Sequence, residues 1–206
     1  MKIVVPDLGL SNLWSALRAL ESLGHEAVAT ARPGQVAAAE TILLPGVGAF
    51  AEASRRLERT GLGKAIQSAA AGGARVIGIC LGMQLLFETS EEGEDQPGLG
   101  LLPGRVVRLS GRALVPHVGW NSVRATEAGR ALFGESDGGD FYFVHSFVAL
   151  PASENLVLAR CLHGESFAAA VGDTTCIGFQ FHPEKSGAAG VRLLGTALEM
   201  IHRRAA

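Results

Sequence analysis

The sequence predicts one α/β domain built around a doubly wound, mostly parallel β-sheet with antiparallel additions. In the first half of the chain, short apolar runs alternate with segments of helical periodicity, which is typical of a parallel sheet covered by helices. After Gly104 the runs become strand-like with little helix between them, which indicates antiparallel strands. With 206 residues, 48% of them hydrophobic, the chain can bury a substantial core, so we expect a single domain over residues 1–206.

The expected elements follow from the local pattern of apolar residues. In the first half, strands are expected at 2–6, 26–31 and 40–44, and a further strand ends at Cys80. Helices are expected at 12–20, 51–59 and 63–71. In the second half, strands are expected at 105–109, 113–123, 141–150, 156–162 and 166–171, followed by a strand-like run from Cys176 and a helix at 190–204. The acidic segment 91–98 has Gly and Pro but no periodicity, and it predicts an exposed loop.

Composition and charge exclude several classes of function. The net charge of −2 and the lack of a long basic run argue against nucleic acid as a partner. No apolar run has membrane length, and Met1 and Lys2 lead directly into a strand rather than a signal peptide, so we expect a cytoplasmic protein with no membrane partner. The three cysteines are far apart and form no cluster with metal-ligand spacing, so no metal or cofactor is expected.

The most informative stretch is the apolar run that ends in Gly78-Ile79-Cys80-Leu81-Gly82 and continues into a helical pattern. Glycines two residues either side of Cys80 permit a sharp strand-to-helix turn, because a Cβ there would obstruct it. The turn projects the Cys80 sulfur out of the fold near the positive end of the following helix, which favours the thiolate. We therefore predict a nucleophile elbow; the alternative is a buried structural cysteine beside glycines that allow tight packing.

A cysteine nucleophile needs a base and a group that orients the base. His182 and Glu184 follow the strand-like run from Cys176, and residues two apart in an extended chain lie on the same face. Pro183 disfavours helix at the residue before it and keeps this run extended. We expect His182 to act as general base and acid and Glu184 to orient it; the alternative is an ordinary polar strand end. His145 is a rival base, but no carboxylate stands two residues beyond it.

At this point the chain resembles the class I (triad) glutamine amidotransferases over nearly its whole length. The resemblance rests on the segments 45–50, 78–84, 116–121, 141–146 and 181–187. Within this class it is most similar to the glutaminase subunits of imidazole glycerol phosphate synthase in histidine biosynthesis, because Lys185-Ser186-Gly187 separates it from other amidotransferases. The resemblance implies a flavodoxin-like sheet. Leu8, Ser11 and Phe147 depart from the family pattern.

The resemblance also implies further site residues around Cys80. The backbone amides of Val47 and Leu81 would form an oxyanion hole, in which each donor contributes on the order of 10²–10³ in kcat. L-glutamine would be held by Gly48, Gln84 and Ser146. Glu88, one helical turn beyond Gln84, is a weaker candidate that fits a solvated helix face equally well. The alternative for the segment around Val47 is a plain Gly-rich turn.

The activity implied by the resemblance is hydrolysis of L-glutamine to glutamate and ammonia through a thioester on Cys80. A (β/α)₈-barrel cyclase subunit would form a heterodimer with this chain, receive the ammonia and make imidazole glycerol phosphate and an aminoimidazole carboxamide ribotide. Lys185 would lie at the interface, and the strands after residue 104 would face the partner. Two alternatives are another amidotransferase subunit, as in anthranilate or pyridoxal phosphate synthesis, and a noncatalytic binding subunit with the same fold.

Overall fold

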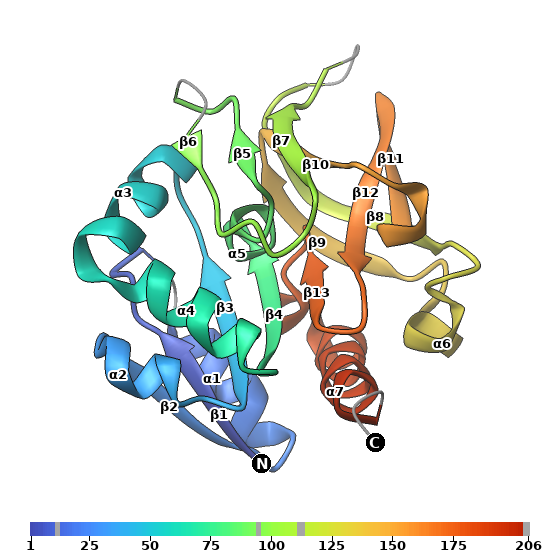
Figure 1. Cartoon of the computed structure of the whole chain (residues 1–206). Helices are drawn as coiled ribbons and strands as arrows, with labels where there is room; N and C mark the ends of the chain where they lie inside the picture. The colour runs from blue at the N-terminus through green and yellow to red at the C-terminus, as the bar shows by residue number, and fades with distance from the viewer. Residues whose placement is uncertain (11–12, 94–95, 111–113, 204–206) are drawn as a thin grey trace.

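A computed structural model describes residues 1–10, 13–93, 96–110 and 114–203. Its main sheet begins with parallel strands in the order β2-β1-β3-β4-β13 (Figure 1). These strands are β1 (Lys2–Pro6), β2 (Glu26–Thr30), β3 (Thr41–Gly46), β4 (Arg75–Cys80) and β13 (Cys176–Phe179). This is the strand order of flavodoxin-like sheets, and such sheets bind ligands beyond the carboxyl ends of their strands.

Helices cover both faces of the parallel strands, because neighbouring strand residues point to opposite sides. Ile77 of β4 lies in one apolar cluster and Val76 in the other. The first cluster includes α1 (Leu13–Ser22) and α7 (Gly187–Arg203). The second includes α2 (Pro33–Ala37), α3 (Phe50–Thr60) and α4 (Leu62–Ala71). The predicted doubly wound α/β fold is therefore confirmed, and α2 is an addition that the sequence pattern did not indicate.

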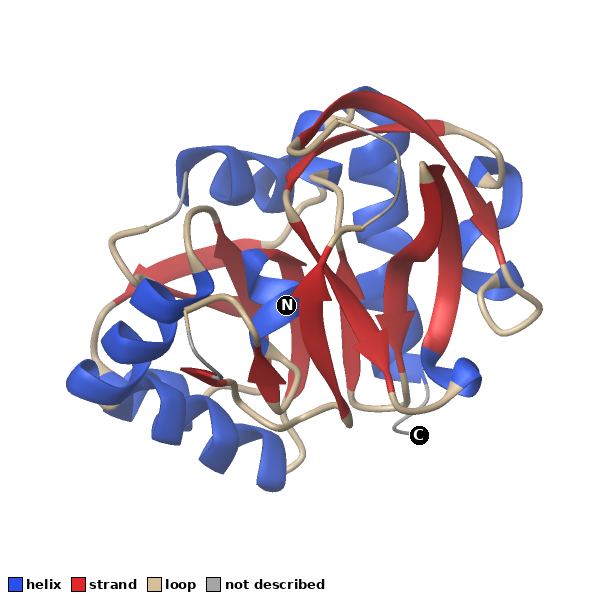
Figure 2. Cartoon of the chain, turned by 90° about the horizontal axis from the view of Figure 1, so that it is seen from above, coloured by secondary structure: helices blue, strands red, loops and turns tan. Residues whose placement is uncertain are grey.

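Antiparallel strands extend the sheet beyond β13, as expected for the second half of the chain. They follow in the order β12 (Glu165–Gly172), β11 (Val157–His163), β8 (His117–Ala125) and β9 (Asp140–His145). A smaller sheet has the order β10 (Phe147–Pro151), β7 (Gly104–Arg108), β5 (Thr89–Ser90) and β6 (Gln96–Pro97). A short helix, α6 (Arg130–Phe133), separates β8 from β9. Figure 2 shows the strands of both sheets from above.

The prediction of one strand over 141–150 is wrong. The chain leaves the main sheet after His145 and enters the smaller sheet at Phe147, so β9 and β10 have different partners. The Ser146 carbonyl at the break accepts from the Leu109 amide at 2.9 Å. Both halves are nearly continuous runs of apolar residues, so the sequence pattern does not reveal the change of sheet.

Other expected boundaries differ at the ends of elements. The helix expected from residue 12 begins at Leu13, and residues 11 and 12 lie outside the described part of the chain. Positions 113 and 204, where a strand and the last helix were expected to begin and end, also lie outside it. The acidic segment 91–98, which was expected to be a plain loop, contains the short strand β6.

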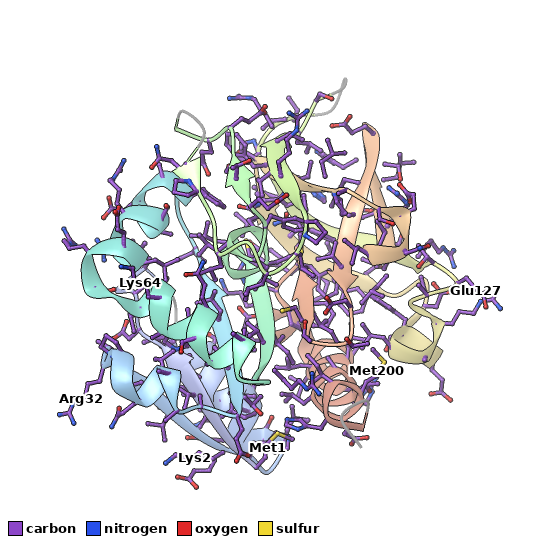
Figure 3. All side chains as sticks on the ribbon, viewed as in Figure 1. Met1, Lys2, Arg32, Lys64, Glu127 and Met200 are labelled. Atoms are coloured by element: carbon purple, nitrogen blue, oxygen red, sulfur yellow. The ribbon has the colours of Figure 1, made fainter. Side chains whose placement is uncertain are left out.

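Charged side chains such as those of Arg32, Lys64 and Glu127 project from the periphery of the molecule (Figure 3). Across the described ranges, no helix is both long and apolar enough to cross a membrane. The same ranges contain no group of three His, Cys, Asp or Glu side chains arranged to hold a metal ion.

Candidate active site

Cys80 occupies a strained turn between β4 and the short helix α5 (Leu81–Leu85). Its φ of 54° and ψ of −111° make it the only non-glycine residue with positive φ among those that the structure describes. A Cβ on Gly82 would lie 1.7 Å from the Leu44 carbonyl oxygen, and a Cβ on Gly78 would lie 2.6 Å from the Gly82 oxygen. Glycine is therefore required on both sides, and the strain fits a functional position.

The other two cysteines differ from Cys80 in their surroundings. Burial raises the pKa of Cys161 to about 12 and that of Cys176 to about 12 as well. Both thiols therefore stay protonated and unreactive at neutral pH. Cys80, by contrast, lines a cavity.

His182 and Glu184 form a buried pair, with 2.8 Å between His182 Nδ1 and Glu184 Oε1. Only 2% of the His182 side chain and 5% of the Glu184 side chain are exposed, so water screens the pair weakly. The expected extended geometry is wrong. The strand ends at Phe179, and Pro183–Lys185 form the 3₁₀ turn η3, which brings the carboxylate back to the imidazole.

The Ser186 hydroxyl fixes this turn against β9. It donates to the His182 carbonyl at 2.7 Å and accepts from the Tyr142 amide at 3.0 Å. The His182 amide in turn donates to the Tyr142 carbonyl at 2.9 Å. These three bonds set the position of the imidazole, and an extended strand end would not provide them.

The protonation of His182 is set by its neighbours. Burial by itself lowers the pKa of His182, but the nearby Cys80 sulfur and the Glu184 carboxylate outweigh it and raise the pKa to about 9. His182 is therefore an imidazolium at neutral pH, placed between a sulfur and a carboxylate. His182 Nε2 makes no hydrogen bond of normal geometry to a described residue, so it is available to a reacting group.

Cys80 opens into a cavity of about 230 Å³ at the carboxyl ends of the parallel strands. The residues expected at the site that line it are Val47, Gly48, Cys80, Leu81, Gln84 and Ser146. Glu92, Pro116, Val144, His145 and Phe147 complete the lining. The site brings together β3 and β4, where Gly46 pairs with Cys80, and the break between β9 and β10.

The Val47 amide does not point freely into this cavity. It donates to the Leu10 carbonyl at 3.2 Å, while Gly48 has a φ of 105°. A Cβ on Gly46 would lie 3.0 Å from Leu81 Cβ and 3.1 Å from the Gly82 nitrogen. The segment is therefore packed tightly against the elbow, and one of the two expected oxyanion donors is engaged elsewhere.

Two other candidates, Glu88 and Lys185, lie outside this cavity, and a third, His145, has both ring nitrogens engaged. Glu88 lies outside the cavity lining, and its carboxylate accepts from the Gly104 amide at 2.8 Å. Lys185 is partly exposed on the turn η3, again outside the lining. The rival base His145 has both ring nitrogens engaged, by His117 and by the Phe147 carbonyl, each at 3.0 Å. Neither nitrogen is left for the Cys80 sulfur.

Two polar residues at the site were not singled out from the sequence. Gln180 is fully buried beside the elbow; its Nε2 lies 3.9 Å from Cys80 Sγ and its Oε1 accepts from Gln84 at 3.1 Å. The signal that could have identified Gln180 in the sequence is a polar residue between two phenylalanines in an apolar run. Glu92 comes from the acidic segment assigned no chemistry, yet it lines the cavity and accepts from the Phe50 amide at 2.9 Å.

Comparisons with known proteins agree with this architecture. The family model for "Glutamine amidotransferase class-I" matches residues 4–196. A crystal structure of a glutamine amidotransferase superposes with a TM-score of 0.73 at 20% identity, covering 97% of this chain and 98% of the other. A chain in the structure of PurLQS from Thermotoga maritima gives a TM-score of 0.69 at 20% identity, covering 100% and 99%. The fold and the family match define the class: this is a class I glutamine amidotransferase.

Curated relatives narrow the class to one family. The chain is 45% identical to the imidazole glycerol phosphate synthase subunit HisH of Moorella thermoacetica, covering 97% of this chain and 95% of the relative. It is 44% identical to the HisH subunit of Methanopyrus kandleri, covering 96% and 98%. The chain therefore belongs to the HisH family of class I glutamine amidotransferases, and the resemblance predicted from its motifs is confirmed.

Proposed function

We propose that this chain is the glutaminase subunit of an imidazole glycerol phosphate synthase, with Cys80 as nucleophile, His182 as acid and base, and Glu184 as the group that orients His182. The observation that carries the proposal is the buried 2.8 Å pair of His182 and Glu184 beside a strained Cys80 that opens into a cavity. A noncatalytic binding subunit would have no need of a strained cysteine next to a charged histidine.

In this mechanism the Cys80 thiolate attacks the side-chain amide carbon of L-glutamine. The carbon–nitrogen bond then breaks as His182 Nε2 gives its proton to the leaving nitrogen, which departs as ammonia and leaves a γ-glutamyl thioester. A water attacks the thioester, His182 takes one of its protons, and glutamate leaves with the thiolate restored. Glu184 holds Nδ1–H throughout, which keeps Nε2 directed at the reacting atoms.

Gln84, Gly48, Ser146 and Glu92 suit the amino-acid end of the substrate. Both Nε2 protons of Gln84 are engaged, by the Phe147 carbonyl at 2.9 Å and by Gln180 at 3.1 Å. Its Oε1 atom is therefore the group left to accept from a substrate N–H. The Glu92 carboxylate, at the same cavity, would attract the substrate's ammonium group.

The oxyanion hole would consist of the amides of Leu81 and Val47. In the arrangement described, the Val47 amide bonds to the Leu10 carbonyl and is withheld from the reaction. Turning the peptide between Gly46 and Val47 would aim that amide at the oxyanion. A missing donor costs about 2.7–4 kcal/mol of transition-state stabilisation, so the isolated subunit would be slower by two to three decades.

The partner would dock on the outer face of β8 and β9. Val118 and Trp120 on this face are 57% and 58% exposed, and Trp120 packs edge-on to Tyr142 with 6.2 Å between ring centroids. Val144 continues the face and lines the cavity, and its carbonyl lies 3.8 Å from Cys80 Sγ. A cyclase subunit on this apolar surface would receive ammonia without its release to water, and Lys185 would lie near the entrance.

The test is Cys80→Ala in the complex with the cyclase subunit. Glutamine-dependent synthesis is expected to disappear while ammonia-dependent synthesis remains, because only the source of ammonia is lost. Cys161→Ser is the matched control, since that thiol is buried away from the cavity. Synthesis from glutamine in the Cys80 variant would refute the nucleophile assignment, and failure to bind any cyclase would favour another amidotransferase assembly.

A further inference from the structure

Two buried histidines next to the cavity take no part in the mechanism above. His117 on β8 and His145 on β9 are directly paired in the sheet and are 3% and 7% exposed. His117 Nδ1 lies 3.0 Å from His145 Nε2. A nitrogen pair at this distance needs one donor and one acceptor, so the two rings constrain each other's tautomers.

The direction of these hydrogen bonds follows from the group at one end. His145 Nδ1 lies 3.0 Å from the Phe147 carbonyl, which can only accept, so Nδ1 carries the proton. In a neutral ring Nε2 then accepts, and His117 Nδ1 must donate to it. His117 Nε2 is left to accept from Asn121 Nδ2 at 3.3 Å. The bonds therefore run in one direction, from Asn121 through both imidazoles to the Phe147 carbonyl.

Both rings must be neutral for this series to exist, and the surroundings keep them so. Burial, with a smaller contribution from His117, lowers the pKa of His145 to about 3. Burial, with a smaller contribution from His163, lowers the pKa of His117 to about 4. At neutral pH both histidines therefore have one donor and one acceptor nitrogen.

The far end of the series is part of the glutamine cavity. The Phe147 carbonyl that accepts from His145 also accepts from Gln84 Nε2 at 2.9 Å. Gln84 Nε2 also donates to Gln180 Oε1, and Gln180 Nε2 lies 3.9 Å from Cys80 Sγ. The carbonyl has two lone pairs and each receives one N–H, so its position sets that of Gln84.

We propose that His117 and His145, both as Nδ1–H tautomers, are positioning residues that fix the Phe147 carbonyl and through it the Gln84 amide at the wall of the glutamine cavity. The inference rests on the proposed function only in taking glutamine as the occupant of that cavity. The competing explanation is packing alone, since His117 also stacks on Phe143 at 4.8 Å and on His163 at 4.0 Å between ring centroids.

Two substitutions of His145 separate these explanations, because an Asn amide lies near the imidazole Nδ1 position and a Gln amide near Nε2. His145→Asn keeps a donor to the Phe147 carbonyl, and the KM for glutamine should stay within about threefold of wild type. His145→Gln loses that donor, and the KM should rise about tenfold or more with kcat nearly unchanged. Packing alone predicts similar losses in both variants, or a larger loss for the smaller Asn, and either result would overturn the proposal.

His163→Phe is the control, because it keeps a ring stacked on His117 and lies outside the hydrogen-bonded series. Its KM should match wild type. These kinetics are measured in the complex with the cyclase subunit.

A second readout is independent of activity. In the imidazole ¹⁵N spectrum of the wild-type protein, His117 and His145 should both appear as neutral Nδ1–H tautomers between pH 6 and 8. An Nε2–H tautomer at either residue would refute the series even if glutamine is the substrate. If the spectrum agrees while Cys80→Ala retains glutaminase activity, the proposed mechanism fails and the tautomer assignment stands.

Discussion

Arg56 holds the loop that supplies the resting partner of the Val47 amide. Its guanidinium Nη1 donates to the Leu8 carbonyl at 2.9 Å and to the Gly9 carbonyl at 3.2 Å, immediately before Leu10. The substitution Arg56→Met keeps much of the side-chain length and removes both of these hydrogen bonds. The Leu10 carbonyl is then less firmly placed, which weakens its hydrogen bond to Val47.

The size of the effect follows from the hydrogen bond between the Val47 amide and the Leu10 carbonyl. A neutral hydrogen bond contributes about 0.5–1.5 kcal/mol net, so losing its full value would shift the population toward a free Val47 amide by about two- to twelvefold. Glutamine hydrolysis by the isolated subunit should rise by the same factor, because the resting state limits that rate. The rate in the complex with the cyclase subunit should stay unchanged if, as we propose, binding of the partner turns the Val47 amide toward the oxyanion.

The assay is glutamate release with and without the partner, together with the rate of Cys80 alkylation by iodoacetamide. Arg55→Met is the matched control, because Arg55 is more exposed and pairs with Glu52 at 3.3 Å, as Arg56 does at 2.7 Å. It should change neither rate. An unchanged or lower unstimulated rate in Arg56→Met, with alkylation as in wild type, would refute the role given to the Val47 bond.

Two further predictions concern the charged groups at the site. The kcat/KM for glutamine should fall as pH rises through about 9, where His182 loses its proton. Glu184→Gln should move this fall to lower pH, because the carboxylate helps to raise the His182 pKa. A pH profile that is the same in both proteins would contradict this. Lys185→Ala should weaken the coupling of glutamine hydrolysis to synthesis more than it changes the KM for glutamine, and the ratio of ammonia formed to product made in the complex measures this. A large rise in KM with coupling intact would place Lys185 at the substrate instead.

The main sheet and the turn at Cys80 could be predicted because their signals are local. Each parallel strand is an apolar run in its own right, and the helices between them repeat apolar residues at helical spacing. The glycines around Cys80 reflect contacts of the turn with its own strand and helix and with the neighbouring strand, where a Cβ would meet Leu44 or Gly82. Such short-range requirements are visible in the residue types themselves.

The break at Ser146 and the turn after Phe179 depended on tertiary contacts. A run of mostly apolar residues is equally consistent with one strand in one sheet or with two strands in two sheets, and only the available partner strands decide between them. The residues Pro183–Lys185 became a 3₁₀ turn because the Ser186 hydroxyl ties that turn to β9, far away in the sequence. The sequence identified His182 and Glu184 as neighbours but gave the wrong geometry for their contact.

The sequence by itself determined the class of fold, the family and the residue types at the site, because these depend on local periodicity and on motifs. Only the tertiary structure decided how the polar groups are paired. The Val47 amide is engaged by Leu10, and the Phe147 carbonyl receives both His145 and Gln84. Hydrogen bonds between residues distant in the chain depend on the register of neighbouring strands, and no pattern within a single segment records that register.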